Sequence, residues 1–215
     1  MNYNKKTVYC FKQKKIKYTK QVRKQTEEKM ELEILHTIQG IRTELLDSIM
    51  LVITKLGDIG LLWILTGVLL LAVPAIGNEK KEHVSMRRKM GICMLGALLL
   101  NLICGNLILK NIFQRPRPFS VDTSVIPLIT ASDYSFPSGH TSSSFAAACA
   151  IFLYHKKAGI FAFIVAGMIA FSRMYLFVHY PTDILGGIVL GVVCAIVVKC
   201  ILEKIVKNKF PSENK

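Results

Sequence analysis

Five long apolar runs dominate the sequence, and they constrain the fold more than any other feature. They cover residues 59–76, 91–109, 141–154, 158–178 and 184–201. Most are close to the roughly 20 residues that a helix needs to cross about 30 Å of hydrocarbon. The third is short, but Ser and Thr residues extend it back to Pro137, so it counts as a span. We therefore predict an all-α fold, a polytopic membrane helical bundle with five strong spans.

Composition agrees with a membrane protein and gives no indication of a metal site. Hydrophobic residues make up 52% of the 215 residues, and the mean hydropathy is +0.40, which exceeds what one soluble core of this size uses. Five of the six cysteines lie inside the apolar runs, and none forms a CxxC pair. They are interpreted as small buried hydrophobes. We predict no metal ligands and no cofactor.

The amino-terminal 29 residues are polar and rich in lysine, without the features of a signal peptide. They contribute much of the net charge of +14. A nucleic acid could attract such a tail, but a solvated arm near anionic lipid headgroups is the favoured interpretation, and no nucleic-acid partner is expected. We predict a disordered tail over residues 1–29, a membrane domain over 30–204 and a polar tail over 205–215.

Residues 34–56 show apolar side chains at helical spacing, with charged residues between them. Those charges favour an amphipathic helix in the membrane interface over a sixth span. The alternative stays open because five spans with a cytoplasmic C-terminus would place the basic N-terminal tail outside the cell. That position conflicts with the positive-inside rule.

Lysine and arginine clusters in short loops indicate the orientation of the chain. The clusters lie within residues 80–89, 155–157 and 204–209. The positive-inside rule places all three in the cytoplasm. The loop of residues 110–137 and the turn around His179 then face outward.

Three clusters of polar residues border the apolar runs, and this topology brings all of them to the outer face. They are Lys110 with Arg115 and Arg117, then Pro137, Ser138, Gly139 and His140, then Ser172, Arg173, His179 and Asp183. Ionisable residues at such positions are costly, so a functional role is the first hypothesis. Taken singly, each has an ordinary explanation, such as a snorkelling anchor, a helix cap or a loop histidine.

Together the clusters supply what phosphoryl transfer needs. Guanidinium groups match phosphate oxygens in a bidentate fork, and a helix that starts after Pro137 offers free N–H groups to an anion. His179 and Asp183 are four residues apart, so one helical turn lets the carboxylate fix the imidazole tautomer and leave the other nitrogen free to attack. A nucleophile, positive charge and an acid for the leaving oxygen are thus all available.

The same residues resemble the type 2 phosphatidic acid phosphatase superfamily. Its three motifs are matched without a gap by Lys110, six residues, Arg117 and Pro118; by Pro137, Ser138, Gly139 and His140; and by Ser172, Arg173, five residues, His179, three residues and Asp183. The resemblance covers about residues 30–204. Arg115 lacks the family's spacing from Lys110 and is the less favoured phosphate ligand.

The resemblance implies a metal-independent membrane phosphatase with a covalent intermediate. His179 would attack phosphorus to form a phosphohistidine, Asp183 would orient it, and His140 would protonate the leaving alkoxide and then activate water. The phosphate oxygens would be held by Lys110, Arg117, Ser138, Gly139 and Arg173.

The expected partners are the lipid bilayer and a lipid phosphate or diphosphate. Candidates are undecaprenyl diphosphate, phosphatidylglycerophosphate, phosphatidate and diacylglycerol diphosphate, and a prenyl diphosphate or a phosphatidate-type lipid is favoured. The expected location is the cell membrane, plasma or inner, with the site on the extracytoplasmic face. A soluble haloperoxidase with a vanadate pocket is disfavoured by the spans. A transporter or silent scaffold with an anion site remains an alternative, and it would tolerate Asn or Gln at both histidines. The sequence predicts no oligomeric state.

Overall fold

The computed structural model describes residues 26–72 and 81–209, and every regular element among them is helical. Residues 26–39 form a first helical segment. The following elements are α2 (Glu44–Leu56), η1 (Asp58–Gly60), α3 (Leu61–Ala72), α4 (Lys81–Asn101), η2 (Leu102–Leu109), α5 (Lys110–Phe113), α6 (Pro118–Val121), α7 (Gly139–Tyr154), α8 (Lys156–Tyr175) and α9 (Pro181–Lys209). The all-α prediction is therefore confirmed for the described residues.

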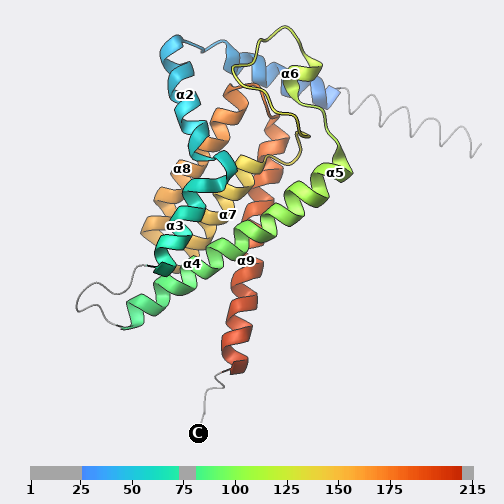
Figure 1. Ribbon diagram of the computed structural model, residues 1–215. Helices are drawn as coiled ribbons and strands as arrows, with labels where there is room; N and C mark the ends of the chain where they lie inside the picture. The colour runs from blue at the N-terminus through green and yellow to red at the C-terminus, as the bar shows by residue number, and fades with distance from the viewer. Residues whose placement is uncertain (1–25, 73–80, 210–215) are drawn as a thin grey trace, which may run out of the picture.

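Helix α7 lies at the centre of the bundle and packs against α8, α9 and α4 (Figure 1). Small residues allow this close packing: Ala146, Ala147 and Ala148 are fully buried. At Gly191 of α9, a Cβ atom would lie 2.3 Å from the backbone oxygen of Ser142, so only glycine fits there. Because α7 is enclosed by other helices, it needs few large apolar side chains of its own.

Four helical stretches are long and apolar enough to cross a membrane. They are Glu44–Ala72, Glu82–Val121, Lys156–Tyr175 and Pro181–Asn208. Four of the five predicted runs overlap these stretches, one run to each stretch. The remaining run lies in α7, which has 16 residues and is shorter than the roughly 20 that a full crossing needs. The chain is thus a multi-pass membrane protein with four candidate spans among the described residues.

The N-terminal region is arranged differently from the single amphipathic helix expected over residues 34–56. The chain turns at Gly40, and α2 begins after Thr43, whose side chain accepts a hydrogen bond from the Leu46 N–H at 3.2 Å. Helix α2 continues through η1 into α3, so that most of the amphipathic segment and the first apolar run share one candidate span. Positive φ angles at Ile59 and Gly60 mark the break between α2 and α3. Residues 1–25, which hold most of the predicted basic tail, lie outside the described residues.

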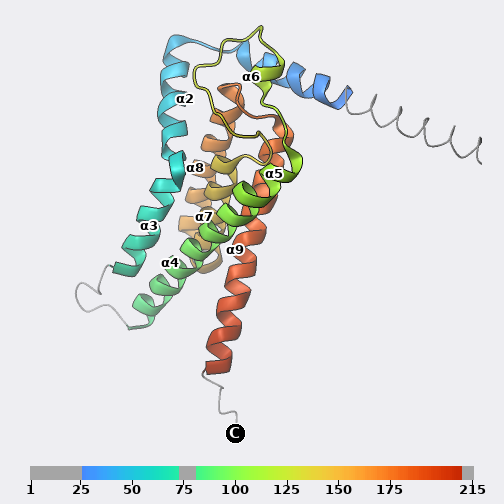
Figure 2. The ribbon, with the colours of Figure 1, turned by 45° about the vertical axis from the view of Figure 1, so that its right-hand side comes forward.

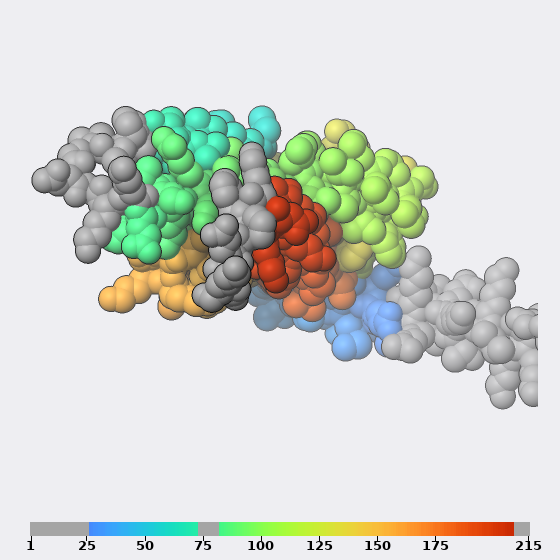
Figure 3. Space-filling model, turned by 90° about the horizontal axis from the view of Figure 1, so that it is seen from below, coloured from blue at the N-terminus to red at the C-terminus, as the bar shows by residue number. Residues whose placement is uncertain are grey.

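The first helical segment lies across one end of the bundle, close to α6 (Figures 1 and 2). A hydrogen bond of 2.7 Å between His36 and Asp122 links this segment to the end of α6. The Gln39 side chain donates a second hydrogen bond to the backbone oxygen of Tyr175 at 2.8 Å. The opposite end is seen in Figure 3, where the C-terminal part of α9 stands beside the start of α4. The polar clusters predicted to be functional lie at the α6 end, because α7 and α9 both begin there.

Candidate active site

Three buried cations, which we call the phosphate cradle, come together from three different elements. Lys110 begins α5, Arg117 precedes α6 and Arg173 lies in the last turn of α8. Their exposed fractions are 6%, 5% and 4%. Gln114 in a left-handed conformation ends α5, and Pro118 starts α6, so the chain turns between the first two cations. Buried positive charge of this density is stable only with an anion beside it.

His179 lies in the turn between α8 and α9, with Phe177 at a positive φ. Its Nε2 atom is 3.2 Å from Nη1 of Arg117, and its Nδ1 atom is 3.5 Å from the Asp183 carboxylate. The Ser135 hydroxyl is 3.3 Å from the same Nδ1. A carboxylate at Nδ1 favours the tautomer that holds its proton there and leaves the Nε2 lone pair facing the cradle. Burial lowers the pKa of His179, and the Asp183 carboxylate opposes that effect only in part, while Arg117 and Arg173 add to it.

Asp183 is completely buried and receives contacts from several directions. It accepts from the Tyr180 N–H at 2.9 Å and from the Ser135 hydroxyl, and it pairs with Arg115 at 2.7 Å. Arg115 in turn pairs with Glu31 of the first helical segment. Arg115 therefore supports the carboxylate that lies beside Nδ1 of His179, and it does not line the cavity described below.

His140 stands at the start of α7, with Nε2 2.8 Å from Oδ1 of Asp58 in η1. Gly57 makes room for the ring, because a Cβ atom there would lie 2.8 Å from Cδ2 of His140. Gly139 lines the cavity, but Ser138 does not. The Ser138 hydroxyl accepts a hydrogen bond from the Thr141 hydroxyl at 3.0 Å, and its N–H donates to the backbone oxygen of Asp183 at 3.1 Å. Among the predicted phosphate ligands, Ser138 is thus the one that does not line the cavity.

Asp133 was not predicted from the sequence, yet its carboxylate contacts two cations of the cradle. It pairs with Lys110 through one oxygen and with Arg117 through the other, at 2.5 Å for the latter. Burial raises the pKa of Asp133, but the hydrogen bond and charge of Lys110 and the charge of Arg117 outweigh burial and bring that pKa to about 2. The side chain nevertheless remains 53% exposed. An ionised carboxylate therefore stands where a substrate phosphate would meet these cations.

Ser135 and Asp58 were also missed by sequence reasoning. Ser135 and Asp133 share the loop before Pro137, where no helical or strand period singles out a residue. Asp58 lies between Gly57 and Ile59, in the break of a candidate span, and an acidic residue inside an apolar region was the available signal.

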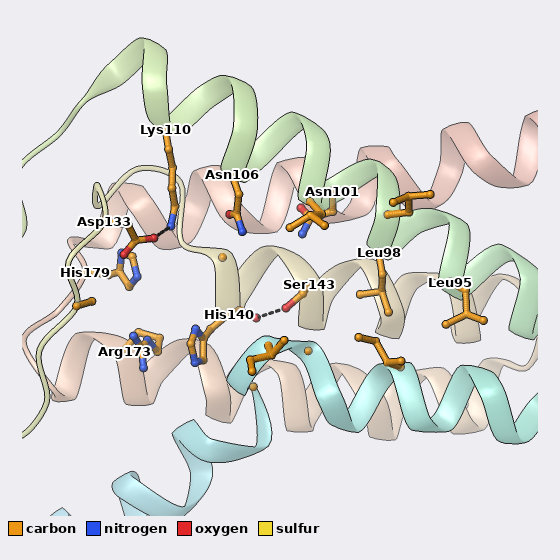
Figure 4. Close-up of a pocket in the computed structure, with 18 of the residues that line it drawn as sticks. Leu95, Leu98, Asn101, Asn106, Lys110, Asp133, His140, Ser143, Arg173 and His179 are labelled. Atoms are coloured by element: carbon orange, nitrogen blue, oxygen red, sulfur yellow. Dashed lines mark hydrogen bonds and ion pairs between the residues drawn. The ribbon is translucent and has the colours of Figure 1, made fainter.

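A cavity of about 580 Å³ connects the cradle to an apolar chamber (Figure 4). One end is lined by Lys110, Arg117, Asp133, Gly139, His140, Arg173 and His179, and the other by Ile59, Ile64, Leu95, Leu98, Leu99 and Leu102. The apolar part lies between α3 and α4. Within residues 26–72 and 81–209, no group of three His, Cys, Asp or Glu side chains is placed to hold a metal ion. The cavity thus suits a ligand with an anionic head and an apolar tail.

The sequence and the fold of this chain are similar to those of known membrane phosphatases. The chain is 30% identical over 167 residues to the undecaprenyl-diphosphatase BcrC of Bacillus subtilis, covering 76% of this chain and 80% of that protein. It is 39% identical over 127 residues to phosphatidylglycerophosphatase B of the same organism, covering 50% and 59% respectively. The crystal structure of a transmembrane PAP2-type phosphatidylglycerolphosphate phosphatase from Bacillus subtilis superposes with a TM-score of 0.65 at 27% identity, over 84% of this chain and 88% of that one.

The family model of the PAP2 superfamily matches residues 90–207, which include every predicted site residue. All three cradle cations, His140 and the pair of His179 and Asp183 lie in that stretch, and the structure gathers them around one cavity. The chain therefore belongs to the PAP2 superfamily.

Proposed function

We propose that this membrane lipid phosphatase removes phosphate from a lipid phosphomonoester or diphosphate through a phosphohistidine formed at Nε2 of His179. The cavity is the main support for the proposal, because it joins the buried cations and His179 to the apolar chamber between α3 and α4. A substrate with one phosphate head and one or more hydrocarbon chains matches both parts. The names of the relatives, an undecaprenyl-diphosphatase and two phosphatidylglycerophosphate phosphatases, support the lipid class.

In the first step, the Nε2 lone pair of His179 attacks phosphorus in line with the ester oxygen. The P–N bond forms while the P–O bond breaks, and His140 gives a proton to the leaving oxygen. The Nδ1 proton stays on the ring, where Asp183 stabilises the positive charge that develops. Lys110, Arg117, Gly139 and Arg173 are proposed to hold the phosphate oxygens, as electrostatic stabilisation of this transfer requires.

In the second step, His140 accepts a proton from water as the water oxygen bonds to phosphorus. The P–N bond then breaks, which restores His179 and releases inorganic phosphate. Ser138, included among the expected ligands, would act by positioning the start of α7, because it does not line the cavity. No step of this sequence uses a metal ion or a cofactor.

We also propose that α7 completes a set of five spans and that the site faces the extracytoplasmic side of the plasma or inner membrane. The basic clusters support this orientation. Helix α7 begins at the site and ends at Tyr154 before the cluster at residues 155–157, and α9 begins beside the site and ends in the lysines after residue 203. The positive-inside rule places those ends in the cytoplasm. The contacts of Glu31 with Thr182, at 3.0 Å to its N–H, support a domain that starts near residue 30 and ends near 204.

Phosphate release by the detergent-purified protein tests the proposal. The substrates are phosphatidate, phosphatidylglycerophosphate, diacylglycerol diphosphate and undecaprenyl diphosphate, each with a chelator present. His179→Ala is expected to abolish release, and His140→Ala is expected to reduce it by a factor of about 10² to 10⁴. Trapping with a radiolabelled substrate head group should yield an acid-labile phosphoprotein in the wild type and none in His179→Ala. Release that survives His179→Ala, or that requires an added metal, would overturn the mechanism. No release by the wild type on any of the four substrates would favour an anion-binding scaffold or transporter.

A further inference from the structure

Beyond the cradle, the cavity wall carries two amide side chains that the proposed chemistry does not use. Asn106 and Asn101 line the cavity, and Figure 4 shows them in a row between Lys110 and the leucines Leu98 and Leu95. A Cβ atom at Gly139 would lie 3.5 Å from Oδ1 of Asn106, so this amide lies against the start of α7. A ligand that runs from the cradle into the apolar chamber must therefore pass both amides.

The row exists because η2 is a π-helix. In an α-helix each residue advances by about 100°, so Asn101 and Lys110, nine positions apart, would point to opposite faces. In η2 the hydrogen bonds run from residue i+5 to residue i, as the Lys110 N–H shows by donating to the oxygen of Gly105. A turn then takes about 4.4 residues, and spacings of four and five stay on one face. Such π segments within helices are frequent at functional sites.

Asn101 is 6% exposed, and its Oδ1 atom is buried without a hydrogen-bond partner. Nε of Arg173 is also buried without a hydrogen-bond partner. In the part of the chain that the structure describes, these two are the buried side-chain N and O atoms that lack a partner. Both residues line the same cavity. Since buried polar atoms are nearly always paired, a ligand that brings a hydrogen-bond donor to Oδ1 of Asn101 and an acceptor to Nε of Arg173 would satisfy both.

The part of the cavity wall beside Asn101 and Asn106 is formed by uncharged side chains. The three cations of the cavity wall are all in the cradle, and the polar residue of α7 that also lines the cavity beside the amides is Ser143. A second phosphate group would need cations there, and a prenyl chain would leave the amides without partners. An ester carbonyl can accept from the NH₂ group of either amide, and a hydroxyl can in addition donate to Oδ1 of Asn101.

We propose that Asn101 and Asn106 bind the ester and hydroxyl oxygens of a glycerol backbone, so that the site prefers a glycerophospholipid monoester over a prenyl diphosphate. This inference rests on the proposed function and deepens it. The phosphate occupies the cradle, the glycerol region lies along the amides, and the acyl chains enter the chamber between α3 and α4.

The test compares kcat/KM on four lipids in mixed micelles: diacyl phosphatidate, 1-acyl lysophosphatidate, dialkyl ether phosphatidate of the same chain length, and a prenyl diphosphate. Asn101→Leu keeps the shape of the side chain and removes its polar atoms. Asn111→Leu makes the same change at an exposed position outside the cavity and serves as the control. His179→Ala reports on the phosphatase mechanism itself.

Asn101→Leu is expected to lower kcat/KM about tenfold on the diacyl and lyso substrates, which carry carbonyl or hydroxyl groups, and less than about twofold on the ether and prenyl substrates. Asn111→Leu should leave all four unchanged. An equal loss on all four lipids, or no loss on the first two, would overturn the inference. If His179→Ala abolishes activity in that same set of measurements, the proposed function stands and only the glycerol subsite is refuted.

Discussion

Asp133 gives the sharpest test of how the cradle works, because its carboxylate contacts two of the three cations that a phosphate would use. Inorganic phosphate, the product, must displace this carboxylate in order to bind. We therefore expect Asp133→Asn to bind phosphate more tightly than the wild type does. Since the pKa of Asp133 is about 2, the carboxylate is ionised at any working pH and acidification does not remove it.

The size of the effect follows from the two contacts. A hydrogen bond to a charged group contributes about 1.5–3 kcal/mol, but the Asp133 side chain is 53% exposed and solvent screening reduces each contact to roughly 0.5–1 kcal/mol. Together they oppose phosphate binding by roughly 1–2 kcal/mol. At 1.4 kcal/mol for each factor of ten, the inhibition constant for phosphate should fall by about 5- to 30-fold.

The assay measures competitive inhibition of lipid hydrolysis by inorganic phosphate for both forms. Asp122→Asn is the matched control, because Asp122 lies on the same loop and bonds to His36 and Ser124 away from the cavity. A lower KM for the lipid substrate should accompany the tighter inhibition in Asp133→Asn. Weaker phosphate inhibition in Asp133→Asn would refute the reasoning, since it would mean that Asp133 holds Lys110 and Arg117 in place and does not compete with the ligand.

Three further outcomes are expected. The pKa of His179 is lowered by burial, so the free enzyme should keep this imidazole neutral below pH 6.5, and the acidic limb of kcat/KM against pH should lie below that value. For the same reason, the free energy of unfolding should decline as the pH falls below about 6.5, because the unfolded chain then binds a proton that the folded chain excludes. Arg115→Gln removes the buried partner of Asp183 and should lower kcat by about 10- to 150-fold with a smaller change in KM, whereas an unchanged kcat would show that Asp183 needs no support from Arg115. Gly191→Ala should lower the unfolding temperature in detergent, since its Cβ would lie 2.3 Å from a backbone oxygen of α7, at a cost of about 1–3 kcal/mol; Gly167→Ala, whose Cβ meets nothing within 4 Å, is the control and should be neutral or stabilising.

The apolar runs and the three motifs were sufficient to predict helices and the residues that line the polar end of the cavity. Lys110, Arg117, His140, Arg173 and His179 all reach it. Lys110, His140 and His179 were predictable because they adjoin the ends of apolar runs, and Arg117 and Arg173 because they lie near such ends. Ser138 shows the limit of that reasoning, since a motif position does not reveal whether the residue reaches the cavity.

The π-helix and the kinked first span could not be predicted from residue periodicity. Residues 102–109 contain one amide side chain, Asn106, among mostly apolar ones, so the spacing of Asn101, Asn106 and Lys110 becomes recognisable as a row only when the π register is known. Residues 34–56 have a clear helical period, but the turn at Gly40 and the break at Gly57–Gly60 depend on contacts with α7 and α8. Asp133 lies in an irregular loop, where its position follows from the cations that it meets and not from any local pattern.

Two carboxylates in the site differ in how firmly they are held, and this difference suggests how the cavity tolerates its buried cations. Asp183 is fully buried, paired with Arg115 and bonded to Ser135 and the Tyr180 N–H, so it is a fixed neighbour of His179. Asp133 is half-exposed on a loop and can leave. A cradle without an anion would carry unpaired buried charge, which is strongly destabilising. In the proposed mechanism, Asp133 would supply that anion until a substrate phosphate replaces it, so that the cations stay buried and oriented and no empty cationic pocket is exposed.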